Sequence, residues 1–391
     1  MIHKFIVENF QSIDEPLEIS FLVDDKIPDS NRYFRSESGN RASLVTALIG
    51  PNAVGKTTAL RALSFIRWLF VSSFYASHYD EGLPFTPFAG KSGRRLTRLA
   101  VEFELEDSIY EYRVVIRKTR ITEEQLSERS KVTKRFTTKK LFTRRWDRKT
   151  QSYAIVDDGF GLPEGYWRSN ELKCTSLIAA AAKFGHQHAT KLVGYWRNVQ
   201  SNVEDDRYYR PASYSMYDAL RYFDRDKETK KNVERDAKRY ADLGINAFNS
   251  GRIRHKYGDI EFDLDPDQES SGTRNYISMY KMIKIVLDNG GIAIIDEFDA
   301  YLHFNMFKSL LNMFFEPSIN KRGGQLLLTT HNLGIFSIVD PKHQILLAEK
   351  NNNGSTVLYK IKDRPDANFL QKYLGGYYGA LPTIHEENFE N

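Results

Sequence analysis

The sequence predicts an α/β fold: a sheet of parallel core strands plus antiparallel N-terminal strands, interrupted by a helical and basic insertion. Three observations predict this fold class. Short apolar runs alternate with helical patterns at both ends of the chain, a glycine-rich turn joins a strand to a helix near residue 50, and the middle is basic and helical. The chain has 391 residues, 41% of them hydrophobic, and a single cysteine, so it can form two or three packed units without disulfides.

The first half of the sheet is predicted within residues 1–120. Apolar runs and period-two alternation predict strands at 2–8, 17–22, 44–50, 99–105 and 110–116. A long apolar segment from about Thr57 to Phe74 predicts a helix. The last two strands are close enough in sequence to form a hairpin.

The second half is predicted within residues 268–391. We expect helices at 273–288 and 304–315, and strands at 291–295, 325–329, 344–348 and 355–361. The two halves, 1–120 and 268–391, then form one head. Residues 121–267 form the basic and helical insertion.

The residues between 113 and 149 are strongly basic, with 14 Lys and Arg against 4 Asp and Glu. Two interpretations remain open: a hairpin with its cations on the solvent face, or a surface that binds nucleic acid or a trigger protein resembling it. The candidate cations are Arg117, Lys118, Arg129, Lys131, Lys134, Arg135, Lys139, Lys140, Arg144 and Arg145. Further along, 213–243 predicts a helical hairpin whose mixed charge suits either a solvated face or a partner surface.

A phosphate-binding loop is the strongest local signal. Residues 50–57 read G-P-N-A-V-G-K-T, which matches G-x-x-x-x-G-K-[ST] between an apolar strand and a helix. Backbone N–H groups of such a loop surround phosphate oxygens, Lys56 reaches the β- and γ-phosphates, and Thr57 ligates Mg²⁺. The nucleotide-binding residues of this segment are therefore predicted to be Asn52, Gly55, Lys56, Thr57 and Thr58.

Two further strands are predicted to end in polar residues at the same sheet edge. Asp296 and Glu297 follow the buried run 291–295, where Asp296 can support Mg²⁺ and Glu297 can act as a general base. The alternative for this pair is an acidic helix cap. His331 follows the run 325–330 and is predicted to contact the γ-phosphate or orient water, the alternative being an ordinary loop histidine.

The segment E-S-S-G-T-R at 269–274 opens a predicted helix. Small hydroxyl and glycine residues at a helix start are first of all an N-cap. The functional interpretation adds that Ser271 and Gly272 can bind the γ-phosphate of a nucleotide presented by another subunit.

The order of these motifs resembles that of the ABC-type ATPases. The segments 7–13, 231–248, 269–303, 325–332 and 373–382 resemble the RloA/AbiLi-type ATPases of the RecF/SMC/OLD branch, which serve anti-phage defence systems such as PARIS. The resemblance implies an ABC-type P-loop ATPase head with ATP and Mg²⁺ as cofactors. It also implies a homodimer or higher oligomer in which Ser271 and Gly272 act in trans and Asp299 lies at the D-loop position. The chain departs from transporters in its S-S-G-T loop and from many relatives in Tyr377, and no Q-loop glutamine is assigned.

Relatives of this length are commonly encoded with a separate toxic effector, a Toprim-like or HNH nuclease. The resemblance therefore implies an ATPase that acts as sensor or scaffold for such an effector. A RecF/SMC-like DNA-maintenance ATPase is the alternative, and a transporter subunit is a third hypothesis. We expect a cytoplasmic protein without membrane contact, because no secretory h-region and no run of about 20 apolar residues is visible.

Overall fold

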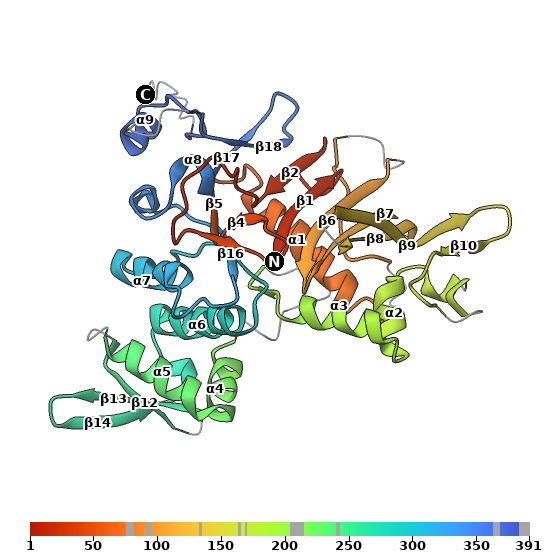
Figure 1. Ribbon diagram of the computed structural model, residues 1–391. Helices are drawn as coiled ribbons and strands as arrows, with labels where there is room; N and C mark the ends of the chain where they lie inside the picture. Colours follow the sequence, from red (N-terminus) through yellow and green to blue (C-terminus); the bar gives the residue numbers. More distant parts are fainter. Residues whose placement is uncertain are drawn as a thin grey trace, which may run out of the picture.

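The computed structural model describes ten ranges of the chain. They are 1–75, 82–90, 95–132, 135–162, 166–168, 170–203, 215–239, 243–249, 251–362 and 368–382. The chain forms an α/β fold with two larger sheets and two smaller ones (Figure 1).

The core sheet has six strands in the order β11-β15-β16-β5-β17-β18. The strands are β5 (Val45–Ile49), β11 (Gln200–Ser201), β15 (Ile292–Ile295), β16 (Gln325–Thr329), β17 (Ile345–Lys350) and β18 (Thr356–Lys360). All neighbouring strands pair in parallel except β18, which returns antiparallel to β17. The residues of β5, β15 and β16 are all buried, as expected for parallel strands covered on both faces.

Three helices accompany the core sheet: α1 (Lys56–Val71), α6 (Ser271–Asn289) and α7 (Phe304–Phe315). Helix α1 follows β5, α6 precedes β15, and α7 connects β15 to β16. The predicted fold class is confirmed, because core strands from the first and last parts of the chain interleave. In particular, β5 from the first part lies between β16 and β17 from the last.

An antiparallel sheet of seven strands lies beside the core, in the order β10-β9-β8-β7-β6-β1-β2. Its strands are β1 (Ile2–Glu8), β2 (Leu17–Ser20), β6 (Thr97–Leu105), β7 (Ser108–Arg117), β8 (Arg120–Val132), β9 (Arg135–Asp147) and β10 (Ser152–Asp157). This sheet continues from the predicted head into the predicted insertion, because the proposed boundary at residue 121 falls at the start of β8. The head and insertion boundaries stay a prediction.

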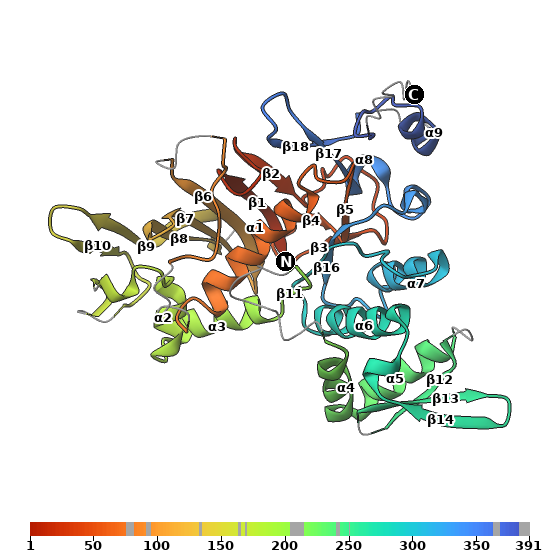
Figure 2. The same cartoon turned by 180° about the vertical axis from the view of Figure 1, so that it is seen from behind.

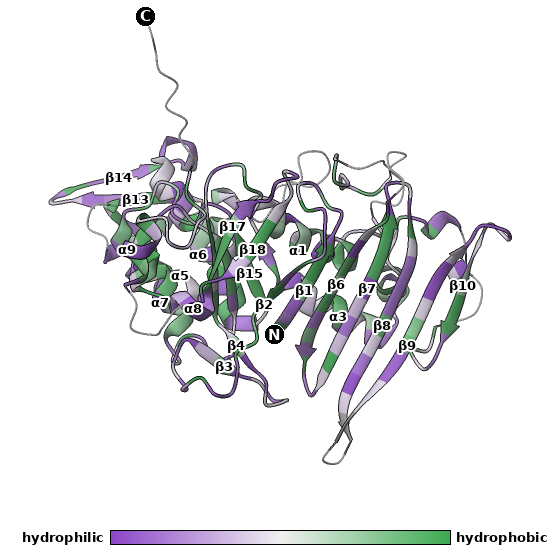
Figure 3. Ribbon diagram, turned by 90° about the horizontal axis from the view of Figure 1, so that it is seen from above, coloured by the Kyte–Doolittle hydropathy of each residue, from purple (hydrophilic) through white to green (hydrophobic). Residues whose placement is uncertain are grey.

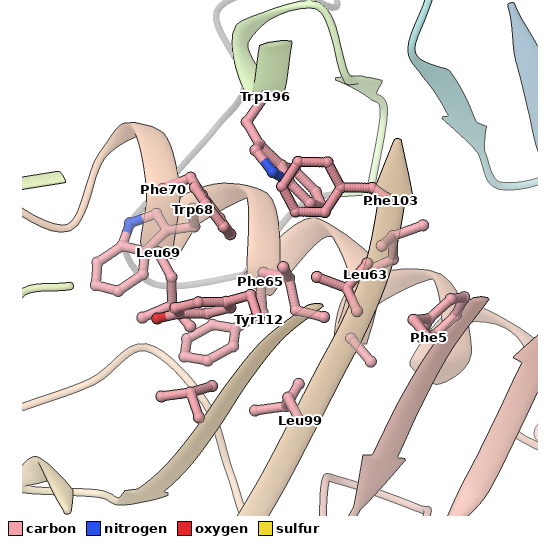
Figure 4. Close-up of a cluster of buried hydrophobic side chains, with 14 of the residues drawn as sticks. Phe5, Leu63, Phe65, Trp68, Leu69, Phe70, Leu99, Phe103, Tyr112 and Trp196 are labelled. Carbon is pink, nitrogen blue, oxygen red and sulfur yellow. The ribbon is translucent and has the colours of Figure 1, made fainter. Parts of the chain in front are cut away.

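Helix α1 joins the phosphate loop to the antiparallel sheet through a dense aromatic cluster (Figure 4). The ring of Phe70 stacks on Trp196 with centroids 4.8 Å apart and lies 4.7 Å from the ring of Tyr112 on β7. Phe65 stacks on Trp68 one turn away at 5.6 Å. Burial of these large rings fixes α1 against the sheet and thereby fixes the loop that precedes it.

The middle of the chain contains helices, as the sequence predicts, and a small sheet that it does not. The helices are α2 (Leu177–Lys183), α3 (Gln187–Arg197), α4 (Met216–Arg225) and α5 (Lys227–Lys238). The last two form the expected helical hairpin. They are followed by a three-stranded sheet of β12 (Ile245–Asn249), β13 (Arg252–Tyr257) and β14 (Ile260–Leu264), which lies at one end of the molecule in both views (Figures 1 and 2).

The remaining elements are short. They are β3 (Tyr33–Arg35), β4 (Arg41–Ser43), α8 (Pro341–Gln344) and α9 (Phe369–Leu374), with 3₁₀ turns at Tyr166–Arg168, Asn170–Leu172, Pro266–Gln268 and Leu333–Ser337. Hydrophobic and hydrophilic residues alternate along the strands of the antiparallel sheet (Figure 3). Within the described ranges, no helix is both long and apolar enough to cross a membrane.

Candidate ATP site

The phosphate loop runs from the end of β5 to the start of α1, as the motif predicts. Two of its residues have left-handed backbone angles, Ala53 with φ 63° and Gly55 with φ 101°. The ammonium of Lys56 lies inside the loop and donates to the carbonyl oxygens of Gly50 and Pro51, at 2.7 Å each. The side chain is therefore held where phosphate oxygens would enter the loop.

Gly55 is required by close packing as well as by its backbone angle. A Cβ atom there would overlap the hydroxyls of Ser12 and Thr356. The two hydroxyls hydrogen-bond each other at 2.8 Å, and Thr356 also donates to the carbonyl of Val54 at 2.7 Å. The N-terminal turn and β18 thus support the loop from outside, through two residues, Ser12 and Thr356, that lie in no sequence motif.

Burial lowers the pKa of the Lys56 ammonium. The negative charges of Asp296, Glu297 and Asp299 act in the opposite direction on that pKa. These three acidic residues from the other half of the chain therefore lie close enough to Lys56 to influence it, as predicted for residues at one sheet edge.

Asp296 sits at the centre of a hydroxyl network at the end of β15. Its carboxylate accepts hydrogen bonds from Thr57 at 2.7 Å and from Thr329 at 2.5 Å. The Thr329 hydroxyl also accepts from the backbone N–H of Glu297, at 2.8 Å. Strands β5, β15 and β16 therefore bring the phosphate loop and the acidic pair together. No motif in the sequence marks Thr329.

Asn202 is a second missed residue. It follows β11, which pairs with β15, and its side-chain amide clamps the backbone of Asp296. The Asn202 Nδ2 donates to the Asp296 carbonyl at 3.0 Å, while its Oδ1 accepts from the Asp296 N–H at 2.7 Å. The sequence around Asn202 shows no motif. Its position beside Asp296 follows from the pairing of the two-residue strand β11 with β15.

The carboxylate of Glu297 is exposed, and within the described residues it forms no hydrogen bond or ion pair. The backbone at this residue is left-handed, with φ 49°, which is uncommon for a residue other than glycine. A cavity of about 520 Å³ opens beside it. The cavity is lined by Glu297 and Asp296 together with Ser271, Arg274, Tyr217 and other residues of α4 and α6.

The start of α6 has the predicted cap, but the capping residue is Ser270. Its hydroxyl accepts from the backbone N–H of Thr273 at 3.1 Å. Ser271 is left exposed, without a part in the cap. Gly272 faces the loop after Glu297, where a Cβ atom would lie 2.9 Å from the Tyr301 carbonyl oxygen.

The other predicted residues lie around this edge with less defined contacts. Asn52 is exposed at the tip of the phosphate loop, and Thr58 is buried and accepts from Ser12 at 3.0 Å. His331 is exposed after β16, and its backbone N–H donates to Asp299 at 3.3 Å. The structure thus places His331 and Asp299 next to each other at the end of β16.

The oxygen donors around Asp296 suit Mg²⁺. A hydroxyl, Thr57 Oγ1, and a carboxylate lie 2.7 Å apart, and Mg²⁺ prefers few protein oxygens together with water and nucleotide phosphates. No group of three or more His, Cys, Asp or Glu side chains within the described part of the chain forms an all-protein metal site. Thr57 and Asp296 are the residues that fit the ion.

Residues 45–337 match the family described as "AAA domain, putative AbiEii toxin, Type IV TA system". The chain belongs to this AAA family. The match includes the phosphate loop, both acidic residues, the start of α6 and His331, so every predicted site residue lies inside the family domain.

The comparison with solved structures finds SMC heads. The SMC head domain from Thermotoga maritima is 15% identical, with a TM-score of 0.40, and covers 93% of this chain and 99% of its own. An SmcHead bound to the C-winged helix domain of ScpA is 12% identical, with a TM-score of 0.42, and covers 92% and 97%. A comparison with curated protein sequences finds no match.

The basic segment is part of the antiparallel sheet, and several of its cations are already engaged. Arg144 is fully buried against Glu124, so counting it among surface cations was wrong. Arg129 and Arg145 pair with Glu102 and Glu123, and Lys118 donates to the carbonyls of Leu83 and Phe85. The side chains of Lys131, Lys134 and Arg135 lie outside the described residues. These contacts fit a hairpin with a mixed solvent face, and binding of a polyanion by this segment stays a prediction.

Proposed function

We propose that this AAA protein binds and hydrolyses ATP, and that ATP-driven pairing of two copies controls a separate toxic effector in anti-phage defence. The observation that carries the ATPase part is the network at one sheet edge. Thr57, Asp296 and Thr329 are joined by hydrogen bonds of 2.5 to 2.7 Å, and the free carboxylate of Glu297 lies directly beside them.

Each residue then has a defined task. The Lys56 ammonium exchanges its two loop carbonyls for phosphate oxygens, which offer a stronger, charge-assisted contact. Thr57 and Asp296 would hold a Mg²⁺ ion, and such an ion would supply positive charge opposite the phosphates. Glu297 accepts the proton of the attacking water, and its strained, N–H-anchored backbone directs the carboxylate outward. His331 orients the water or contacts the γ-phosphate.

The pairing of two copies would complete the site. Ser271 is exposed at the N-terminus of a 19-residue helix, where partial positive charge favours a phosphate. Because Ser270 already caps the helix, the Ser271 hydroxyl is available to a partner. We propose that it meets the γ-phosphate held by the phosphate loop of the other copy.

Two observations support control of a separate effector: the family to which the chain belongs and the resemblance of its motifs to the RloA/AbiLi-type ATPases. The family description names a toxin and a toxin–antitoxin system. We propose a Toprim-like or HNH nuclease as the separate effector, with the trigger a phage protein or nucleic acid and the location the cytoplasm. A DNA-maintenance ATPase of RecF/SMC type would need a free basic surface, and the ion pairs of Arg129, Arg144 and Arg145 do not favour it.

Glu297→Gln separates nucleotide binding from hydrolysis. The amide keeps the size of the side chain but cannot take a proton, so we expect ATP binding to persist and turnover to fall by about 100-fold or more. Binding is measured with a fluorescent ATP analogue and turnover by phosphate release. Glu106→Gln, an exposed acid at the β6–β7 turn of the antiparallel sheet and away from the site, is the control for a general loss of negative charge. Wild-type turnover in Glu297→Gln would remove Glu297 as the base.

A further inference from the structure

A buried acid precedes the start of α6. Glu269 is 7% exposed, and it comes directly before Ser270, the residue that caps the helix. Within the described residues, the polar partner of its carboxylate is His255 alone, whose Nε2–H donates to it over 2.6 Å. A carboxylate removed from water needs such a partner to replace its lost hydration. The His255 side chain therefore determines where Glu269, and the cap that follows it, can lie.

His255 belongs to the small sheet of β12, β13 and β14. It lies on the central strand β13, opposite Ile245 of β12 and Phe262 of β14. Its ring stacks on those of Phe262 and Tyr257, with centroids 5.5 and 6.3 Å away and interplanar angles of 16° and 7°. The two neighbouring strands and the two stacked rings together fix the direction in which the imidazole points.

A second contact from β13 to the same segment is exposed. Arg252 pairs with Asp265 at 2.9 Å, and 58% and 50% of the two side chains are exposed. Exposed pairs of this kind contribute little to stability, whereas removing one partner of a buried pair is costly. The buried pair of His255 and Glu269 is therefore the stronger of these two links between the small sheet and the start of α6.

The other side of the helix start touches the candidate ATP site. Ser271 lines the cavity beside the end of β15, and the side-chain amide of Asn275 donates to the carbonyl oxygen of Ala300 at 2.6 Å. The first turn of α6 is therefore held from two sides, by the loop that follows β15 and by the small sheet. A change at the small sheet can thus reach the residues that we propose to meet a phosphate.

We propose that His255 is a positioning residue for the ATP site. By holding Glu269, it fixes the cap of α6 and therefore the place where the Ser271 hydroxyl and the helix N-terminus meet the γ-phosphate of the partner copy's nucleotide. This role rests on the proposed sharing of ATP between two copies. It gives a task in turnover to the β12–β14 sheet, which lies on the far side of α6 from the core sheet (Figures 1 and 2).

The double variant His255→Phe/Glu269→Leu separates positioning from stability. Phenylalanine keeps a ring in the stack, and leucine replaces the acid by an apolar side chain, so neither partner is left buried with an unpaired polar group. Replacing both partners of a buried pair by apolar groups is often nearly neutral for folding, but it removes the hydrogen bond that holds the segment. Arg252→Gln, which removes the exposed pair on the same strand, is the matched control.

Hydrogen–deuterium exchange of the full chain without nucleotide is the first measurement. We expect amides in the first turn of α6 to exchange about fivefold faster or more in the double variant, as after the loss of a typical helix cap. Exchange in β15 and β16 and binding of a fluorescent ATP analogue should match the wild type, and Arg252→Gln should change none of these readouts. Wild-type exchange at the start of α6 in the double variant would overturn the positioning role.

The ATPase rate of mixed copies is the second measurement. Alone, the double variant should turn over ATP about tenfold more slowly or less, because a small misplacement of a binding group is costly in rate. It should recover when mixed with Lys56→Ala copies, which keep an intact helix end. It should not recover with Ser271→Glu copies, whose helix end would repel the phosphate. A variant that had only lost stability would bind less nucleotide and recover with neither.

A mixture of Lys56→Ala and Ser271→Glu copies shows separately whether ATP is shared. If this mixture recovers activity while the double variant hydrolyses ATP at the wild-type rate, the role of His255 fails and the shared site stands. If this mixture stays inactive, the shared site itself fails, and the role of His255 in it fails with it.

Discussion

Lys56 is held in the phosphate loop by hydrogen bonds to two carbonyl oxygens, and burial lowers its pKa. Lys56→Ala removes the cation that faces the β- and γ-phosphates, so we expect ATP affinity to fall by about 100-fold or more. The measurement is equilibrium binding of a fluorescent ATP analogue. Lys191→Ala, an exposed lysine on α3 away from the loop, is the control and should bind normally. Undiminished binding by Lys56→Ala would refute the loop assignment.

Glu104 is a buried acid away from the candidate ATP site that contributes to the stability of the fold. Burial raises its pKa, but hydrogen bonds from His3 and Ser38 outweigh burial and bring the pKa from 4.5 to about 2. A carboxyl with a lowered folded-state pKa stabilises the fold above its unfolded pKa and loses that contribution as the pH falls.

We therefore expect Glu104→Gln to lower the free energy of unfolding by about 3 kcal/mol at pH 7, from the pKa difference. The difference in free energy of unfolding between the variant and the wild type should become smaller as the pH falls from about 5 toward 2, because Glu104 of the wild type becomes protonated in this range. Urea unfolding over that pH range measures it. Glu106→Gln, an exposed neighbour, should change little, and a gap that is constant with pH would contradict the assignment.

The ion pair of Glu124 and Arg144 ties the hairpin of β8 and β9 to helix α2. Both side chains are fully buried and 2.8 Å apart. Glu124 also accepts hydrogen bonds from the Ser176 hydroxyl at 2.8 Å and from the Leu177 N–H at 3.0 Å, at the N-terminus of α2. The part of the basic segment around Glu124 and Arg144 is therefore buried and packed against the N-terminus of α2.

Glu124→Gln leaves the Arg144 cation buried without its anion. We expect it to cost about 3 to 5 kcal/mol of unfolding free energy. The matched control is Glu123→Gln, one residue earlier, whose pair with Arg145 is exposed and should contribute less than about 1 kcal/mol. Denaturant unfolding of both variants gives the comparison, and equal small effects would contradict the structural role of the pair.

The elements with a strong pattern could be predicted and those without one could not. The strand 292–295 is a continuous apolar run and the strand 325–329 has three leucines at its centre, so their burial could be predicted from the sequence. The strands β13 and β14 could not be predicted, because their outward residues are charged and they contain few apolar residues. β11 could not be predicted because a strand of two residues is too short to show a hydrophobic period. The position of Asn202, which follows β11, could not be predicted for the same reason.

The same contrast applies to the site. Lys56, Asp296 and Glu297 lie in or beside motifs whose chemistry demands those residue types. Asn202 and Thr329 act by holding Asp296 in place, which depends on strands from distant parts of the chain. Such supporting contacts carry no local pattern, so only the three-dimensional pairing of β11, β15 and β16 shows them.

At the scale of the whole molecule, we propose that two copies share each ATP. The variant that tests this is Ser271→Glu rather than a change at Gly272, because a Cβ at Gly272 would press on the Tyr301 carbonyl within one copy. A glutamate in the first turn of α6 favours the isolated helix, since it complements the helix dipole. It should nevertheless repel the γ-phosphate of a partner's nucleotide.

The most direct measurement is the ATPase rate of Lys56→Ala and Ser271→Glu copies, alone and mixed. Each variant alone should be nearly inactive, because every shared site lacks one half. A mixed pair rebuilds one complete site from the phosphate loop of one copy and the helix end of the other. We expect an equal mixture to recover up to about a quarter of the wild-type rate, as random pairing of two-fold dimers requires. Normal turnover by Ser271→Glu alone, or no recovery in the mixture, would contradict the shared site.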